Sequence, residues 1–192
     1  MGIDKKTIKI IHKGKSHWTN RKNDVELTVV LIDEYFKKRS VKVLDVGCAQ
    51  GEHTNLLNQK NIVAEGLDYD MKFIKRARKD YPKIKFTKGD MGKMPFKDNS
   101  FDVVYCVNSL FYTDVLKVLS EFKRVIKKGG LGIITLDRKI INLDKNKKFY
   151  DLDIKDTLKK LDKKIIYKKF KQRTDFFPFK HRHYFYLIAF EN

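Results

Sequence analysis

The chain has 192 residues, of which 42% are hydrophobic and 12% aromatic, a composition that supports one globular domain and excludes an intrinsically disordered chain. No apolar run approaches the ~20 residues of a membrane-spanning helix, and the first residues lack the apolar stretch of a secretory signal, so we expect a cytoplasmic protein. The formal net charge is +19, and two cysteines are too few for a disulfide framework or a metal site.

From residue 24 to residue 136, the apolar periodicity predicts strands that alternate with helices, which implies a parallel sheet with right-handed crossovers. Phe73 and Leu116 are expected on the inner faces of their helices. The predicted helices cover residues 24–38, 52–60, 71–80 and 115–126, and the predicted strands cover residues 41–46, 61–67, 84–87, 101–107 and 131–136.

Beyond residue 137 the pattern changes. A helix is predicted over residues 151–161, followed by strands over 164–170 and 184–190. Because no helix separates these two strands, we expect an antiparallel hairpin at the edge of the sheet.

A glycine-containing turn joins the first strand to the next helix, in the segment Val43-Leu44-Asp45-Val46-Gly47-Cys48-Ala49-Gln50-Gly51. Gly47 and Gly51 allow the close approach of a ligand to the backbone. Asp45 lies at the carboxyl end of the strand, where open α/β sheets bind ligands. Its carboxylate suits a cationic ligand and not a pyrophosphate, and the G-x-G-x-x-G dinucleotide pattern is absent.

This segment resembles motif I of the class I S-adenosylmethionine (SAM)-dependent methyltransferases, D-x-G-x-G-x-G, with Ala49 in place of the middle glycine. The resemblance continues through Gly66-Leu67-Asp68 and Gly89-Asp90-Met91. It extends to Met94-Pro95-Phe96-Lys97-Asp98-Asn99-Ser100-Phe101-Asp102-Val103-Val104, which is similar to the small-molecule branch of the family, and to Arg124-Val125-Ile126-Lys127-Lys128-Gly129-Gly130.

The resemblance implies a Rossmann-like fold with a seven-stranded, mostly parallel sheet of order 3-2-1-4-5-7-6 and helices on both faces. It implies a single domain over residues 1–192 with a SAM-binding core over 41–137. The pattern beyond residue 137 predicts a C-terminal helix and edge hairpin over 138–192, and the irregular, highly charged residues 1–22 are expected to form a lid segment. Asp68 would hold the ribose hydroxyls, Asp90 the adenine amino group and Met91 the adenine ring. The full set of expected cofactor-binding residues is Asp45, Gly47, Cys48, Ala49, Gly51, Asp68, Tyr69, Asp90, Met91, Asn108 and Trp18.

The loop after the fourth strand supplies the candidate catalytic residues, Asn108 and Tyr112. Tyr112 could orient a nucleophile, or it could form an aromatic wall of the site. It would be a poor base, because a phenol has a reference pKa of ~10. Methyl transfer is an in-line displacement on an activated methyl group, so alignment can supply much of the rate without a strong base. Trp18 could cap the cofactor or pack on the first helix.

Basic residues are concentrated in residues 138–182, which hold 16 basic and 6 acidic side chains. Such a density suits an anionic partner, either nucleic acid or an anionic lipid surface, and the loop 171–183 interleaves basic with aromatic residues. Only 8 of the 43 basic residues are arginine, so a general lysine enrichment is the alternative explanation. His181 and His183 have no visible third ligand, and no metal is predicted.

Three functions fit these patterns: a SAM-dependent methyltransferase for a small-molecule or lipid-headgroup acceptor, one for RNA or another macromolecule, and a non-catalytic scaffold with the same fold. Asp45, Asp68 and Asp90 argue against the scaffold. The sequence alone leaves open the acceptor, the methylated atom and the oligomeric state.

Overall fold

The computed structural model describes residues 19–37, 39–60, 62–110, 113–142, 147–175 and 181–192. Its helices are α2 (Thr19–Phe36), α3 (Glu52–Asn58), α4 (Met71–Asp80), α5 (Val115–Val125) and α6 (Ile154–Leu161). Its strands are β1 (Lys42–Val46), β2 (Val63–Asp68), β3 (Phe86–Lys88), β4 (Phe101–Cys106), β5 (Ile126–Asn142), β6 (Lys147–Asp151), β7 (Lys164–Asp175) and β8 (His181–Glu191).

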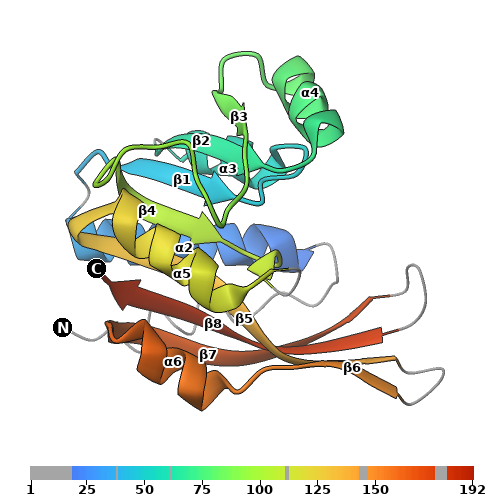
Figure 1. Ribbon diagram of the computed structural model, residues 1–192. Coiled ribbons are helices and arrows are strands. Elements are labelled where there is room, and N and C mark those ends of the chain that lie inside the picture. Colours follow the sequence, from blue (N-terminus) through green and yellow to red (C-terminus); the bar gives the residue numbers. More distant parts are fainter. Residues whose placement is uncertain (1–18, 38, 61, 111–112, 143–146, 176–180) are drawn as a thin grey trace.

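These strands form one sheet in the order β3-β2-β1-β4-β5-β8-β7. The expected order 3-2-1-4-5-7-6 is therefore confirmed, because β8 and β7 are the last two strands of that series. The described residues also contain β6, which pairs antiparallel with the distal half of β5 and was not predicted. Figure 1 shows β6 extending beyond the core together with the distal ends of β5, β7 and β8.

The strands from β3 to β5 pair in parallel, whereas β8 runs antiparallel to both β5 and β7, as the predicted hairpin requires. The carboxyl ends of β1, β2 and β4 consequently meet at one edge of the sheet (Figure 1). In open α/β sheets this edge is where ligands bind.

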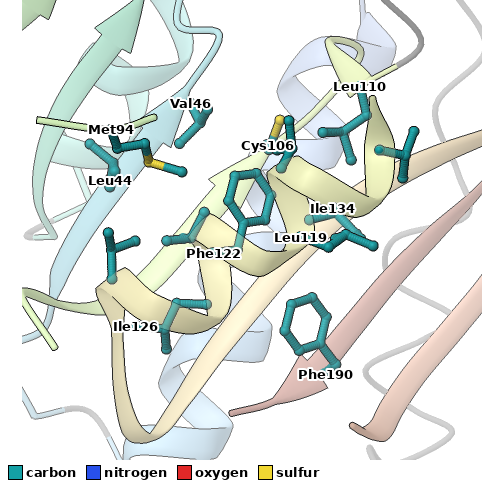
Figure 2. Packing of buried hydrophobic residues seen from close by; sticks show 14 of the residues in the cluster. Leu44, Val46, Met94, Cys106, Leu110, Leu119, Phe122, Ile126, Ile134 and Phe190 are labelled. Atoms are coloured by element: carbon teal, nitrogen blue, oxygen red, sulfur yellow. The ribbon is translucent and has the colours of Figure 1, made fainter. Parts of the chain in front are cut away.

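Two apolar layers enclose the central strands. Alternate residues of β1 point to opposite faces, so that Val43 packs in the cluster beneath α2 and Leu44 in the cluster beneath α5. Figure 2 shows Leu119 and Phe122 of α5 packed against Ile134 and other core side chains. Of these five side chains, all except Val43 belong to the α5 layer. A sheet covered on both faces explains the near-continuous apolar run of β4.

Two inward-facing predictions are wrong. Leu116 is 42% exposed, because the buried stripe of α5 begins at Val115 and continues at helical spacing through Val118, Leu119, Phe122 and Val125. Phe73 is also exposed, because Ile74 and Ala77 fill the inner face of α4. Helix α5 ends at Val125, because Ile126 already has extended backbone angles, and Gly129 and Gly130 belong to β5.

Candidate active site

A cavity of about 440 Å³ opens at the carboxyl edge of the sheet. This volume lies in the range of small-molecule sites. The turn from β1 into α3, the beginning of α4 and the end of β4 supply its walls. The lining residues are Asp45, Gly47, Cys48, Ala49, Gln50, Glu52, His53, Phe73, Val107, Asn108 and Ser109.

Glycine is required at the first position of the β1–α3 turn. Gly47 has a φ angle of +75°, and a Cβ atom at this position would lie 2.3 Å from Oγ of Ser109. The N–H groups of Gly47 and Cys48 donate to the carbonyl oxygen of Leu67 at 2.8 and 3.1 Å, which ties the turn to the end of β2. Ala49 also adopts the left-handed region, with a φ angle of +47°, at a conformational cost that a glycine would not have.

Asp45 is the buried acid of the cavity. Oγ1 of Thr54, on α3, donates a hydrogen bond of 2.6 Å to Oδ2 of Asp45. Burial raises the pKa of the Asp45 carboxyl group to about 7, with a further contribution from the nearby Asp68, although the bond from Thr54 acts in the opposite direction. A cation placed beside this carboxylate would replace the solvation that burial removes, so the cavity favours a positively charged ligand.

Asp68 lies directly beside the glycine turn. Its Oδ2 accepts from the N–H of Ala49 at 2.9 Å and its Oδ1 accepts from the N–H of Asp70 at 2.8 Å. Tyr69, next in the chain, is exposed. Asp68 and Tyr69 are outside the cavity lining and stand at the adjoining end of β2, where a ligand that extends from the cavity would meet them.

Asp90 and Met91 follow β3 on the same edge of the sheet. Oδ1 of Asp90 accepts from the N–H of Gly92 at 2.7 Å, and Met91 is partly buried against the core. The Met91 methyl group would lie 3.8 Å from a Cβ atom at Gly47, so its side chain reaches the glycine turn. The cofactor roles of Asp68, Tyr69, Asp90 and Met91 remain predictions.

The β4–α5 loop contacts the glycine turn from the other side. Asn108 has a φ angle of +61°, and its N–H donates to Oγ1 of Thr135 at 2.7 Å. Oγ of Ser109 donates to the carbonyl oxygen of Gly47 at 3.4 Å. The structure thus brings Asn108 into the same cavity as Asp45, whereas Tyr112 and Trp18 lie outside the described residues and their roles remain predictions.

Sequence reasoning missed His53. The hydroxyl of Tyr105 and Nδ1 of His53 are 3.0 Å apart, within hydrogen-bonding distance. Tyr105 is the direct neighbour of Asp45 across the β1–β4 pair, so the imidazole and the buried carboxylate share one side of the sheet. The only signal in the sequence is that His53 stands two residues after Gly51, at the beginning of a predicted helix.

Cys48 lines the cavity, but burial raises the pKa of its thiol far above the ordinary value. The residue is therefore a neutral wall of the site and not a thiolate. Within the described residues, no group of three or more His, Cys, Asp or Glu side chains could hold a metal ion.

Comparisons with known proteins agree with this geometry. Residues 44–134 match the family described as Methyltransferase domain. An uncharacterized protein of Methanocaldococcus jannaschii is 34% identical over 110 residues, covering 57% of this chain and 47% of that protein. A sterol 24-C-methyltransferase of Gibberella zeae is 38% identical over 102 residues, covering 49% of this chain and 27% of that enzyme. A demethylmenaquinone methyltransferase of Chlorobaculum tepidum is 35% identical over 101 residues, covering 50% of this chain and 41% of that enzyme. The chain thus spans less than half the length of these curated relatives.

Two solved structures share the fold. A putative methyltransferase of Bacillus halodurans superposes with a TM-score of 0.68 at 16% identity, covering 83% of this chain and 97% of that one. A SAM-dependent methyltransferase of Methanosarcina mazei gives a TM-score of 0.68 at 17% identity, covering 84% of this chain and 96% of that one.

Residues 44–134 are thus similar to methyltransferase domains, and one solved structure with the same fold is a methyltransferase that depends on SAM. The donor set fits that molecule, because the lining of the cavity contains a buried carboxylate for a cationic ligand and no lysine or arginine. Among the described helices, none is both long enough and apolar enough to cross a membrane.

Proposed function

We propose that this chain transfers the methyl group of SAM to a small-molecule or lipid-headgroup acceptor. The observation that carries the proposal is the buried Asp45 in a cavity formed by the glycine turn. When bound, SAM supplies a methyl group that its sulfonium already activates. The protein must then bind the cation, align the acceptor and exclude water.

Different described residues contribute to binding the cation and to shaping the site around it. The negative charge of Asp45 is costly to form in the free protein because the carboxyl group is buried. The site therefore binds a cation more strongly than it binds a neutral ligand. Gly47 allows the close approach of the cofactor, and the left-handed Asn108 fixes the loop that faces it. The rate then depends mainly on how the acceptor is oriented, because no described side chain needs to form a covalent intermediate.

His53 is our candidate for the group that receives a proton from the acceptor, and Tyr112 remains a candidate for orienting the nucleophile. Imidazole is the side chain that most often acts as a general base. If Nδ1 of His53 donates to the oxygen of Tyr105, its Nε2 is the basic nitrogen. Acceptors that arrive deprotonated would not need this step.

The named relatives support a small acceptor. Their names give a sterol and demethylmenaquinone as acceptors, and both are apolar small molecules. The cavity volume of about 440 Å³ also suits a small ligand better than a polymer.

Two measurements test the proposal. Calorimetry should detect binding of SAM and of S-adenosylhomocysteine, and radiolabelled SAM should label a component of a lipid or small-metabolite extract in the presence of the protein. The Asp45→Asn variant is the matched control, since it removes the charge and keeps the shape. Absence of binding to either ligand at millimolar concentration would overturn the assignment, and transfer to RNA alone would change the substrate class.

The RNA alternative has one observation in its favour. Phe170 of β7 is exposed beside the ring of Tyr186, at 5.2 Å between ring centroids, and Nζ of Lys168 lies 4.7 Å from the Tyr186 centroid. This combination of aromatic rings and a cation suits base stacking beside a phosphate. Binding of single-stranded RNA that weakens steeply with salt, and that is lost on Phe170→Ala, would favour it.

A further inference from the structure

The centre of the outward face of α4 is basic, and the one exposed acidic residue of the helix is Asp80 at its end. Ile74 and Ala77 are the buried residues of this helix, and the positions on the opposite side of the helical wheel are exposed. Within the part of the chain that the structure describes, no carboxylate forms an ion pair with Lys72, Lys75 or Lys79, although Asp80 pairs with Arg76. We define the α4 basic face by its four residues: Lys72, Lys75, Arg76 and Lys79.

Exposed apolar side chains adjoin this face where α4 begins. Tyr69, Met71 and Phe73 are 74%, 38% and 39% exposed. Phe73 also lines the active-site cavity. The basic face and the cavity are therefore joined by a short apolar margin at the carboxyl edge of the sheet.

A general enrichment in lysine does not explain this arrangement. The exposed positions of α2 include the acidic Glu26 and Glu34, and those of α6 include Asp156 among its lysines. On α4, by contrast, every residue at the centre of the outward face is basic. Residues 69–88 contain eight basic and two acidic side chains, a higher density than that of residues 138–182.

We propose that the α4 basic face docks on an anionic lipid bilayer, with Tyr69, Met71 and Phe73 entering the interfacial region. A helix with a cationic polar face and neighbouring aromatic and aliphatic side chains has the composition of interfacial membrane-binding elements. Three of the four cations are lysines, which act as point charges suited to a diffuse anionic surface, whereas arginine forks suit specific phosphates. Met71 cannot stack on a base, which favours the bilayer over a nucleic acid.

Docking in this orientation would place the cavity mouth at the membrane surface. Because Phe73 belongs to both the apolar margin and the cavity wall, an acceptor dissolved in the bilayer could enter without crossing water. This delivery role rests on the proposed function. The docking itself does not, because it can be measured without acceptor or SAM.

The test is sedimentation with vesicles of equal parts phosphatidylglycerol and phosphatidylcholine, compared with vesicles of phosphatidylcholine alone. We expect binding to the anionic vesicles only. In the triple variant Lys72→Glu, Lys75→Glu, Lys79→Glu, the partition coefficient should fall by about a hundredfold or more, since each basic residue near an anionic surface contributes about fivefold. The variant's affinity for SAM should not change, which also shows that it is folded.

The matched control reverses three exposed lysines of α6 and β7, in the variant Lys155→Glu, Lys159→Glu, Lys168→Glu. It has the same net charge as the first variant and should retain most of the vesicle binding. In a further variant, Met71→Ser, binding should weaken while its dependence on salt remains. An equal loss in both triple variants, unchanged binding in the α4 variant, or binding to single-stranded RNA but not to vesicles would each overturn the proposal.

Discussion

At the scale of single residues, Asp45 links the binding of the cofactor to pH. The raised pKa of about 7 means that the free protein holds this carboxyl group protonated in mildly acidic solution. A bound cation favours the charged form, so binding below this pH must release a proton. The folding stability of the unliganded protein depends on pH in the opposite sense. The raised pKa of Asp45 in the folded state contributes stability that is lost as the pH rises from the ordinary carboxyl pKa towards 7.

We therefore expect the affinity for SAM to increase by up to about tenfold per pH unit below pH 7 and to level off above it. Calorimetry from about pH 6 to about pH 8 measures this dependence. The Asp45→Asn variant should bind SAM more weakly at the upper limit, and with no slope. A slope of equal size in that variant would assign the titration to another group.

Position 49 offers a second test at this scale, because alanine occupies a left-handed backbone conformation there. We expect Ala49→Gly to stabilise the protein by about 0.5–1 kcal/mol, since relief of the left-handed strain exceeds the added entropy of the unfolded chain. Urea denaturation measures the change. Gly47→Ala is the contrasting variant, and it should destabilise the fold because its new Cβ atom would clash with Ser109.

At the scale of elements, Arg124 fixes the loop that connects β3 to β4. Its guanidinium donates to the carbonyl oxygens of Met94 and Phe96 and forms ion pairs with Asp98 and Glu121. The hydrogen bond from Arg124 is also the main cause of the lowered pKa of Glu121. One side chain at the end of α5 thereby holds the loop that contains Asp90 and Met91.

We expect Arg124→Ala to reduce the free energy of unfolding by about 2–4 kcal/mol, because several carbonyl and carboxylate partners lose a charged donor together. Arg124→Lys should recover only part of this loss, since a lysine cannot reproduce the planar fork. Chemical denaturation of the three proteins gives the comparison. A neutral Arg124→Ala variant would show that the loop is held by its apolar contacts alone.

At the scale of the whole molecule, the predicted lid over residues 1–22 falls mostly outside the described residues. We expect deletion of residues 1–18, which include Trp18, to reduce methyl transfer by at least about tenfold while changing the free energy of unfolding by less than about 1 kcal/mol. The buried Val25 and Leu27 of α2 remain in the shortened chain to anchor it. Activity assays and urea denaturation separate the two effects, and full activity after deletion would contradict the lid.

The order of the sheet was implied by the resemblance to the methyltransferases. The amino-acid sequence by itself determined the alternation of strands and helices, the glycine turn and the identity of the acidic residues at the strand ends. These features follow from local rules: a period of two or of 3.6 residues, and backbone angles that favour glycine. The antiparallel hairpin was predictable for the same reason, since no helix-forming segment separates its strands.

Only the tertiary structure decided the extension of β5 and its pairing with β6, the exposure of Leu116 and the place of His53 beside Tyr105. Each of these depends on which distant segment packs against the residue. The basic face of α4 could not be predicted from the sequence for a related reason. The net charge of residues 41–137 adds the cations of α4 to the acids of the strand ends, whereas folding separates these groups onto different surfaces.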